Sequence, residues 1–532
     1  MLLAIVVVAG VRLHLAGAPL ERDEGEYAYA GQLILHGVPP YRLACGMKFP
    51  GTYYAYALIL SLFGETARGI RVGLLLVNAA TIGLVFALGR RLLGPLEAAI
   101  AAISFAVLTL DPWIMGLFAH ATHFVVLPAL AGLLVALRAA ETPRTRPFLW
   151  SGLLLGLAVL MKQHAVFFLP LAAALAVRGA WQRRPAGARL AALALGAAIP
   201  FGVLCTVLLW QGVLRTFWFW TFVYARAYVR ELPLAEFLPQ LSDSFAVAAR
   251  ANLPLWLLAA AGLIPLLSGA YGAEAGLFTT GLLLASFLAV CPGFFFRAHY
   301  FILMLPAIAL QVGVAFGYLG RLLARLVSPR ASQAIAAALF AAVAGGVLFR
   351  ARDSLLFMTP RELIRARYLA NPFVEAVDVA RYIRERTTSD DRIAVLGSEP
   401  EIYFYADRRS ATVHIYTYPL VESQPFASQM QAEMIAQIES AHPTYLVYVK
   451  VMASWLAGPA SDKTIFAWTT RYAASCYDLV GIADMIPPDA TRYVWDEAVK
   501  SYQPSSSNLI LVFRRKSDQP CAVGRVAAPA TS

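Results

Sequence analysis

Residues 21–50, ERDEGEYAYAGQLILHGVPPYRLACGMKFP, separate one apolar segment from a long series of others. The stretch holds four carboxylates and three cations, together with several aromatic residues. Asp23 and Glu24 follow closely after an apolar run of membrane-spanning length, so we expect them near the head-group level of a bilayer. Reagents carried on lipids arrive at that level, and the stretch therefore predicts where the chemistry takes place.

The composition is that of an integral membrane protein. Of 532 residues, 59% are hydrophobic and 14% are charged, against roughly 25% charged residues in soluble domains. Residues 1–349 carry 24 Lys+Arg and 12 Asp+Glu, whereas residues 350–532 carry 20 of each. The net charge of +12 thus belongs to the hydrophobic part, which indicates contact with phosphate or the membrane surface and not a nucleic-acid domain.

The apolar runs predict a polytopic α-helical protein with about eleven transmembrane helices. Ala16 and Ala18 imitate a signal-peptide cleavage site, but the first run has no basic n-region and nearly the length of a span, so we interpret it as a retained helix. The expected spans are 1–20, 69–89, 95–111, 114–138, 148–161, 165–178, 190–210, 253–270, 275–291, 299–319 and 331–349.

Charge in the breaks predicts the orientation. If the first span leaves the cytosol, four arginine-rich breaks at 89–95, 138–147, 178–190 and 320–331 lie inside, in agreement with the positive-inside rule. A fifth inner break, around 271–275, is neutral to acidic and fits least well. We therefore expect a multi-pass protein of the inner membrane whose first outer loop and C-terminal part face the periplasm.

Two short helices are expected in the first outer loop. Residues 52–64 are apolar but too short to span and are bounded by Gly51 and Gly64, and residues 24–36 are amphipathic and end at Gly37. Both patterns favour interfacial helices that cover a cavity between the spans.

The composition changes after Phe349, which predicts two domains, 1–349 and 350–532. In the second, helical spacing at 373–386 and 426–441 and strand-like runs at 392–397, 412–416, 445–450 and 508–513 predict a small α/β domain. We assign it a packing or acceptor-handling role. A disulfide between Cys476 and Cys521 is a further expectation.

Asp23 has two interpretations. With Glu26 three residues later it matches a capping box, in which it would only terminate a helix. A cap explains one acid, but not four acids at a head-group interface near several cations. A carboxylate that takes a proton from an acceptor is what an inverting sugar transfer needs, so we favour a general-base role.

Several cations and histidines lie in the expected outer breaks. Lys48 is either a snorkelling lysine or a contact to a lipid phosphate. Lys162 and His164 interrupt two apolar runs, and Arg297 and His299 precede the tenth span in the same way; ionisable groups at membrane depth are functional candidates.

His120 and His123 lie three residues apart, which is the spacing of a metal pair on a helix. No third ligand accompanies them, so we favour polar lining of the cavity. The outer loops contain no D-x-D pair, and we expect neither a metal nor a cofactor.

Together these stretches resemble the GT-C superfamily of polyprenyl-phosphate-sugar-dependent glycosyltransferases. The branch most similar holds the protein O-mannosyltransferases, the lipid A aminoarabinose transferase and the lipopolysaccharide-core galacturonosyltransferase-like proteins. The resemblance covers roughly residues 15–320 and rests on RDEGEYAYAGQLILHGVPPYR, KFPGTYYAY, FGETARGIRV with GRRLLG, LMKQHAVFFLP and RAHYFILMLPAIAL.

The resemblance implies the GT-C fold, Asp23 as catalytic base and Lys48 in contact with the donor phosphate. His120 and His123 depart from the family, whose members often carry an Arg and an acidic residue there. The residues expected to bind substrates are Glu24, Lys48, Arg71, His120, His123, Lys162, His164, Arg297, His299 and Tyr300.

We therefore predict transfer of a sugar, with inversion, from a polyprenyl-phosphate-linked donor to a lipid, glycan or protein acceptor in the cell envelope. The donor is a substrate, membrane lipids surround the protein, and no nucleic acid is involved. The main alternative is a lipid-linked-saccharide flippase or exporter, although such proteins place ionisable groups near the midplane and show internal repeats. A non-catalytic scaffold would not need the acid cluster.

Overall fold

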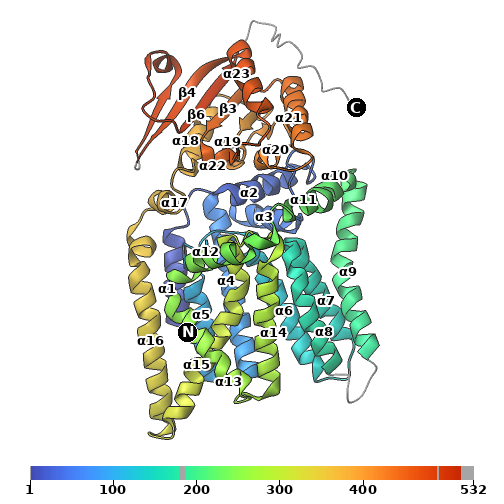
Figure 1. The fold of residues 1–532 in the computed structure, drawn as a ribbon, viewed down its shortest axis with the longest axis vertical. Coiled ribbons are helices and arrows are strands. Elements are labelled where there is room, and N and C mark those ends of the chain that lie inside the picture. Colours follow the sequence, from blue (N-terminus) through green and yellow to red (C-terminus); the bar gives the residue numbers. More distant parts are fainter. Residues whose placement is uncertain (1, 179–185, 488–489, 517–532) are drawn as a thin grey trace. The chain divides into compact units, whose positions relative to one another are not determined.

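The computed structural model describes residues 2–178, 186–487 and 490–516, and its contacts divide the chain into two units (Figure 1). The first unit consists of Met1–Ala18, Lys48–Arg215 and Tyr228–Leu363. The second consists of Pro19–Met47, Thr216–Ala227 and Ile364–Ser532. Most of the acidic first outer loop therefore folds with the C-terminal residues, although the functional division at residue 349 stays a prediction.

The first unit is a bundle of helices. Its elements are α1 (Leu2–His14), α3 (Gly51–Phe63), α4 (Ala67–Leu92), α5 (Pro95–Leu108), α6 (Ala121–Ala140), α7 (Arg146–Met161), η1 (Gln163–Phe168), α8 (Leu169–Arg178), α9 (Ala186–Trp210), η3 (Leu234–Glu236), α12 (Phe237–Arg250), α13 (Leu253–Leu267), α14 (Gly272–Val290), η4 (Pro292–Phe294), η5 (Ala298–Met304), α15 (Leu305–Leu323), α16 (Pro329–Arg352) and η6 (Asp353–Phe357). Short helices α10 (Leu214–Trp218), α11 (Ala225–Val229) and α17 (Pro360–Tyr368) contain the boundaries between units.

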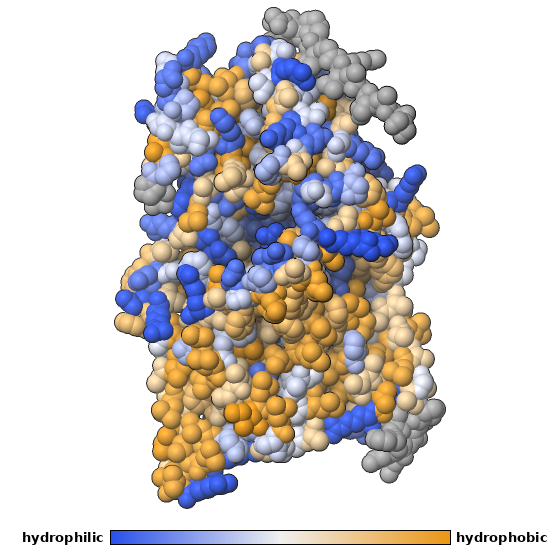
Figure 2. Space-filling view, in the orientation of Figure 1, coloured by the Kyte–Doolittle hydropathy of each residue, from blue (hydrophilic) through white to orange (hydrophobic). Residues whose placement is uncertain are grey.

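Apolar helices occur at each of the eleven expected spans, but not all are long. Six helices in the described residues are long and apolar enough to cross a membrane, and α12 with α13, bent by 109°, gives a seventh if counted as one span. The remaining four expected spans correspond to the shorter apolar helices Ile5–His14, Pro95–Leu108, Arg146–Met161 and Gln163–Arg178. Figure 2 shows apolar residues covering the visible side of this bundle.

One detail of the expected spans is corrected. The fourth begins at Ala121 and not at 114, because residues 111–120 form a series of turns. Residues 211–252, which separate two of the expected spans, contain helical elements that include the amphipathic α12. Apolar and polar residues alternate along α12, so a search for continuous apolar runs does not find it.

Glycines allow the membrane helices to approach closely. On α9, a Cβ added to Gly196 would overlap the carbonyl oxygen of Leu149 on α7, and a Cβ on Gly152 of α7 would overlap the carbonyl of Leu193. A Cβ on Gly262 of α13 would likewise overlap the backbone of α15 at Gln311. The hydrophobic effect does not drive association between helices in lipid. Small residues at such crossings instead let the helix backbones approach closely, so that van der Waals packing holds the helices together.

Ion pairs join the breaks at one end of the bundle. Arg91, at the end of α4, pairs with Glu141 after α6 and with Glu274 at the start of α14, the latter at 3.1 Å. Arg178, at the end of α8, lies 4.0 Å from Glu274. The acidic break around 271–275 therefore lies at the same end as the arginine-rich breaks, so its negative charge is offset by theirs.

The second unit contains a six-stranded mixed sheet. The strand order is β2-β1-β3-β6-β4-β5, in which β1 pairs in parallel with β2 and β3 while the remaining pairs are antiparallel. The strands are β1 (Arg392–Leu396), β2 (Arg409–Ser410), β3 (Tyr445–Lys450), β4 (Tyr477–Ile486), β5 (Ala490–Trp495) and β6 (Leu509–Arg515). The helices are α2 (Arg22–Leu35), η2 (Phe219–Tyr224), α18 (Phe373–Arg384), α19 (Glu401–Ala406), α20 (Tyr418–Val421), α21 (Ala427–Ala441), α22 (Met452–Trp455), α23 (Thr464–Cys476) and η7 (Asp496–Ser501).

The expected α/β character of this unit is confirmed, with one wrong strand. Strands β1, β3 and β6 and helices α18 and α21 lie where the pattern predicts them, but residues 412–416 are irregular and β2 precedes them. The backbone of 412–416 bonds outside the sheet instead: Val413 N donates to Gln437 Oε1 (2.9 Å), and the Val413 carbonyl accepts a hydrogen bond from Cys45 N (2.9 Å). Cys521, and with it the expected disulfide, lies outside the described residues.

Both helices expected in the first outer loop are present. Helix α3 ends before Gly64, whose φ of +85° favours glycine, and α2 ends before Gly37, with φ +76°. Their interfacial placement stays a prediction.

We expect Gly196→Ala to lower the melting temperature of the purified protein, because the new methyl group must push α9 away from α7. Overpacking of this kind costs about 1–3 kcal/mol. Gly202→Ala, on the same helix, is the matched control, because a Cβ added at Gly202 meets no heavy atom within 4 Å. Equal melting temperatures for the two variants would contradict close packing at Gly196.

Candidate active site

A capping box formed by Glu21 and Glu24 begins α2. The Glu21 carboxylate accepts a hydrogen bond from Glu24 N (2.8 Å), and the Glu24 carboxylate accepts one from Glu21 N (3.5 Å). The alternative in which Asp23 and Glu26 form the capping box is therefore wrong, because the box lies two residues earlier in the chain. Asp23 lies within the first turn, where the helix dipole favours a negative charge, and its carboxylate is not needed for the cap.

Arg22 anchors this first turn to the C-terminal part of the same unit. Its Nε donates to the carbonyl of Ser398 (2.6 Å), and Nη2 lies 3.2 Å from Glu399 Oε1. Nη2 also contacts Asn371 Oδ1 (3.1 Å) and the carbonyl of Ala453 (3.2 Å). Nε and Nη2 of the guanidinium are thus engaged by fixed partners, and these contacts set the position of the neighbouring Asp23 within this unit.

Further contacts hold the rest of α2. Tyr29 accepts a hydrogen bond from Ser410 N (2.7 Å) and stacks on Tyr403 with ring centroids 5.1 Å apart. Gly25 faces α19 so closely that an added Cβ would lie 2.7 Å from the backbone nitrogen of Glu401. The helix that carries Asp23 is therefore a rigid part of the sheet-containing unit and not a mobile loop.

Carboxyl groups gather near the start of α2. Burial, followed by the charges of Asp23 and Glu24, raises the pKa of Glu21 well above its ordinary value. Burial and then the charge of Glu399 raise the pKa of Glu401, whose exposed fraction is 0%. These glutamates therefore hold their protons more firmly than exposed carboxyl groups do.

In the first unit, five of the predicted residues come together from three elements. His120, the N-cap of α6, stacks on His299 of η5 with centroids 4.2 Å apart and planes within 4°. Tyr300 contacts the edges of both His299 (4.7 Å) and His164 (4.9 Å). The ammonium of Lys162 lies 4.0 Å from the centroid of the Tyr300 ring. We call these five residues the His120–Tyr300 cluster.

The breaks expected in the spans hold this cluster in place. Lys162 is extended (φ −158°, ψ 132°) between α7 and η1, and His164 Nδ1 lies 2.8 Å from the carbonyl of Ala289. Before η5, Phe294 and Phe296 have φ of +58° and +44°, values that non-glycine residues rarely adopt. Such backbone strain persists where surrounding packing enforces it, often at functional sites.

The other predicted residues of this unit lie as follows. Arg71 of α4 is 5% exposed and lies over the Phe118 ring at 5.3 Å, while Lys48 comes just before α3 and is half-buried. Arg297 is exposed and lies over Phe295 at 5.2 Å. His123 is buried in the first turn of α6 and does not belong to the cluster by ring contacts.

One site residue was missed by sequence reasoning. Arg12 of α1 is buried and donates to the carbonyls of Thr109 (2.9 Å) and Gly116 (3.1 Å), so it fixes the turns that precede His120. A single arginine inside the first apolar run was the available signal. Tyr56 of α3 supports the same segment through the carbonyl of Ala119 (2.6 Å).

Comparison with solved structures gives the fold. ArnT from Cupriavidus metallidurans bound to undecaprenyl phosphate matches with a TM-score of 0.60 and 15% identity, over 96% of this chain and 97% of that chain. Its apo form matches with a TM-score of 0.55. Archaeal oligosaccharyltransferase AglB from Archaeoglobus fulgidus, in complex with an inhibitory peptide and a dolichol-phosphate, gives 0.52 and 14% identity over 93% of this chain and 74% of that chain.

This chain has the GT-C fold, which confirms the fold that the resemblance implies. Residues 47–210 match the family model of dolichyl-phosphate-mannose-protein mannosyltransferase. That match includes Lys48, Arg71, His120 and Lys162 but neither Asp23 nor His299. No curated protein sequence matches the chain significantly.

Within this GT-C chain, Gly25→Ala should displace α2 from α19, since the methyl group would meet the backbone of Glu401. We expect a loss of about 1–3 kcal/mol in stability and faster hydrogen exchange of the α2 amides. Gly10→Ala on α1, where a Cβ meets nothing within 4 Å, is the control. Unchanged exchange in α2 would show that the contact is not tight.

Glu401→Gln should reduce the loss of stability of the second unit at high pH. The unfolded chain ionises Glu401 at the ordinary carboxyl pKa, whereas in the folded protein burial and the charge of Glu399 raise this pKa, so ionisation requires a higher pH. Stability is therefore lost as pH rises from the unfolded pKa towards the folded one, by up to about 1.4 kcal/mol per pH unit.

Thermal unfolding from pH 5 to pH 9 measures this effect. The exposed Glu385→Gln should keep the wild-type pH dependence, and a Glu401→Gln curve parallel to wild type would contradict the assignment.

Proposed function

We propose that this protein is an inverting glycosyltransferase that moves a sugar from a polyprenyl-phosphate-linked donor to a cell-envelope acceptor on the periplasmic face of the inner membrane. The GT-C fold and the match to the mannosyltransferase family model support the reaction class. The structures of ArnT with undecaprenyl phosphate and of AglB with a dolichol-phosphate support a polyprenyl carrier. The acceptor is a lipid, a glycan or a protein of the envelope.

The position of Asp23 is the observation that carries this proposal. Glu21 and Glu24 already cap α2, and Arg22 fixes the first turn, so Asp23 is held rigidly without being needed for the helix. A rigid carboxylate at a helix start is suited to orienting a hydroxyl or amine group. Glu24 is fully buried within the cap, and a contact of Glu24 with substrate stays a prediction.

The proposed step transfers one proton and exchanges one bond. The Asp23 carboxylate takes the proton of the acceptor O–H or N–H as the acceptor atom forms a bond to the anomeric carbon. The bond from that carbon to the phosphate oxygen breaks, and the electron pair leaves with the polyprenyl phosphate. Attack from the face opposite the leaving group inverts the anomeric centre.

Cations of the first unit would stabilise the leaving phosphate. Lys48 is proposed to contact the donor phosphate, and Lys162 and Arg297 are held by nearby aromatic rings at the outer breaks. Fixed charges aimed at a developing phosphate charge are worth more in a water-poor site than in solution. The stacked imidazoles of His120 and His299, with Tyr300, are proposed to line the sugar subsite.

Asp23→Asn should lower kcat by on the order of 10²–10⁴, the usual contribution of a general base, with little change in the KM for donor. Lys48→Ala should instead raise that KM, and Lys48→Arg should restore it in part because the charge is kept. The measurement is release of polyprenyl phosphate from radiolabelled undecaprenyl-phosphate-linked monosaccharides by purified protein in detergent. Envelope extract from a deletion strain supplies the acceptors.

Asp243 is an exposed acid on α12, and Asp243→Asn serves as the control for the loss of one negative charge elsewhere in the protein. Near-normal turnover in both Asp23→Asn and Lys48→Ala would rule out these roles. Transfer in detergent, where no second compartment exists, separates an enzyme from a flippase, which would produce no glycosylated acceptor. Mass spectrometry of the deletion strain's envelope should show species lighter by one sugar residue.

A further inference from the structure

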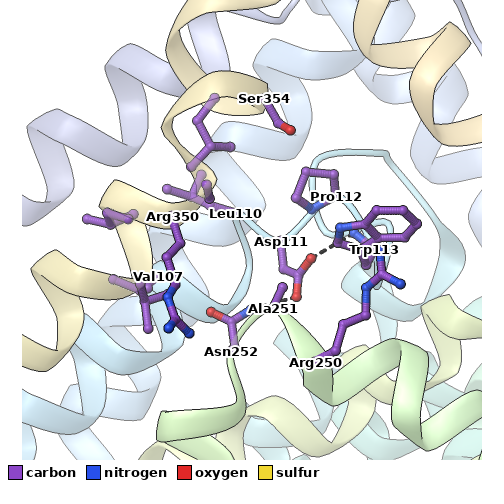
Figure 3. Close-up of a pocket in the computed structure, with 14 residues that line it drawn as sticks. Val107, Leu110, Asp111, Pro112, Trp113, Arg250, Ala251, Asn252, Arg350 and Ser354 are labelled. Atoms are coloured by element: carbon purple, nitrogen blue, oxygen red, sulfur yellow. Dashed lines mark hydrogen bonds between the residues drawn. The ribbon is translucent and has the colours of Figure 1, made fainter.

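A cavity of about 400 Å³ lies in the first unit and includes the start of the turns at 111–120 (Figure 3). Three parts of the chain form it: the end of α5 with the turn after it, the joint between α12 and α13, and the last turns of α16 with η6. Its polar lining consists of Asp111, Trp113, Arg250, Asn252, Arg350 and Ser354. We call this cavity the Arg250–Arg350 pocket.

Asp111 holds two sides of the pocket together. Its Oδ1 accepts a hydrogen bond from Trp113 N (2.7 Å), and its Oδ2 accepts one from Asn252 Nδ2 (2.6 Å). The residue is 4% exposed, so this bridge between the turn after α5 and the α12–α13 joint is largely shielded from water. Both carboxylate oxygens are engaged, which leaves Asp111 poorly placed to bind a cationic ligand.

Two arginines give the pocket its charge. In Figure 3, Arg250 and Arg350 lie on either side of the Asp111–Asn252 pair. The Arg250 guanidinium lies 3.8 Å from the centroid of the Trp113 ring, which fixes its plane. Within residues 2–178, 186–487 and 490–516, neither arginine forms an ion pair. The two positive charges exceed the one negative charge of Asp111.

Part of the pocket lining is apolar. It consists of Val107 of α5, Leu110 in the turn after α5, Val347 of α16 and Leu355 of η6, and Figure 3 shows Val107 and Leu110 beside Arg350. Arg350 lies near the end of a candidate membrane span, and a tryptophan beside an arginine at such a level is typical of the head-group region. Apolar side chains next to two arginines therefore suit a molecule with a hydrocarbon part and an anionic head.

We propose that the Arg250–Arg350 pocket binds the phosphate head group of an anionic glycerophospholipid of the phosphatidylglycerol class. Arginine presents a planar fork that matches phosphate oxygens, and the volume suits a head group with its glycerol. The hydrocarbon chains would run along the apolar side chains. None of the residues that line this pocket is among those proposed to contact the sugar donor.

Lipid binding to the delipidated, full-length protein tests this proposal without an activity assay. Native mass spectrometry and thermal unfolding would compare phosphatidylglycerol, phosphatidylethanolamine and undecaprenyl phosphate as probes. We expect one phosphatidylglycerol to bind preferentially and to raise the melting temperature. The double variant Arg250→Ala/Arg350→Ala should bind it at least tenfold more weakly.

Two further variants make the test specific. Arg352→Ala removes a neighbouring arginine that pairs with Asp353 (3.7 Å) and does not line the pocket, so it should bind as wild type does. Ala351→Trp keeps both arginines but fills the pocket, so it should lose binding, and it keeps the test decisive if the double variant fails to fold.

Four results would overturn the proposal. Equal loss of binding in Arg352→Ala would indicate general surface charge, and unchanged binding in Ala351→Trp would place the lipid elsewhere. Equal or stronger binding of phosphatidylethanolamine would contradict the assigned head group, and so would a loss of undecaprenyl phosphate binding in Arg250→Ala/Arg350→Ala.

Discussion

The buried guanidinium of Arg22 is the constraint on which the second unit depends. A charge taken out of water is costly unless it is paired and its hydrogen bonds are satisfied. Arg22 meets this condition with the Ser398 and Ala453 carbonyls and the Glu399 carboxylate, and it also lies between the rings of Phe373 and Tyr418, 5.2 and 5.0 Å from their centroids. These partners come from a part of the chain more than 340 residues away. The unit therefore cannot form without placing the first turn of α2, and with it Asp23.

In the first unit the equivalent constraint is that backbone polar groups at the breaks between helices need hydrogen-bond partners. Turns at 111–120, the extended Lys162 and the strained turn before η5 each expose carbonyl and amide groups that lipid cannot satisfy. Arg12 and Tyr56 supply hydrogen bonds to the first of these breaks. The same irregular segments carry His120, Lys162 and His299. The helices are therefore interrupted at the places where the polar side chains gather.

Sequence reasoning predicted the features that depend on local pattern. Apolar runs gave each membrane helix, and glycines gave the ends of α2 and α3, because both signals act within a few residues. The cap was misplaced by two residues because Asp is a preferred N-cap residue and Glu is not, whereas the backbone of this protein makes Glu21 the N-cap. Strands β4 and β5 were missed because β4 follows directly on α23 without a break.

Long-range partners were beyond the reach of the sequence. Nothing local indicates that Arg22 meets Ser398, that His120 stacks on His299, or that Asp111 meets Asn252. The expected association of His299 and Tyr300 with Lys162 and His164 is present, although it followed from shared outer placement and not from any spacing. The strength of the sequence argument was thus in assigning residues to the same membrane level, which is a weaker statement than contact.

The arginines of this protein differ in what already occupies their donors, and that difference separates structural from ligand-binding roles. Arg12 and Arg189 donate to backbone carbonyls, and Arg22 to carbonyls and a carboxylate, so their forks hold the fold together. Arg91 and Arg178 pair with acids from neighbouring breaks. Among the described residues, the contact of Arg250 is through the face of its guanidinium, which lies on the Trp113 ring, and no hydrogen-bond acceptor there occupies its N–H groups. A phosphate gains most from an arginine of this last kind, because the plane is preorganised and no existing ion pair must break when it binds.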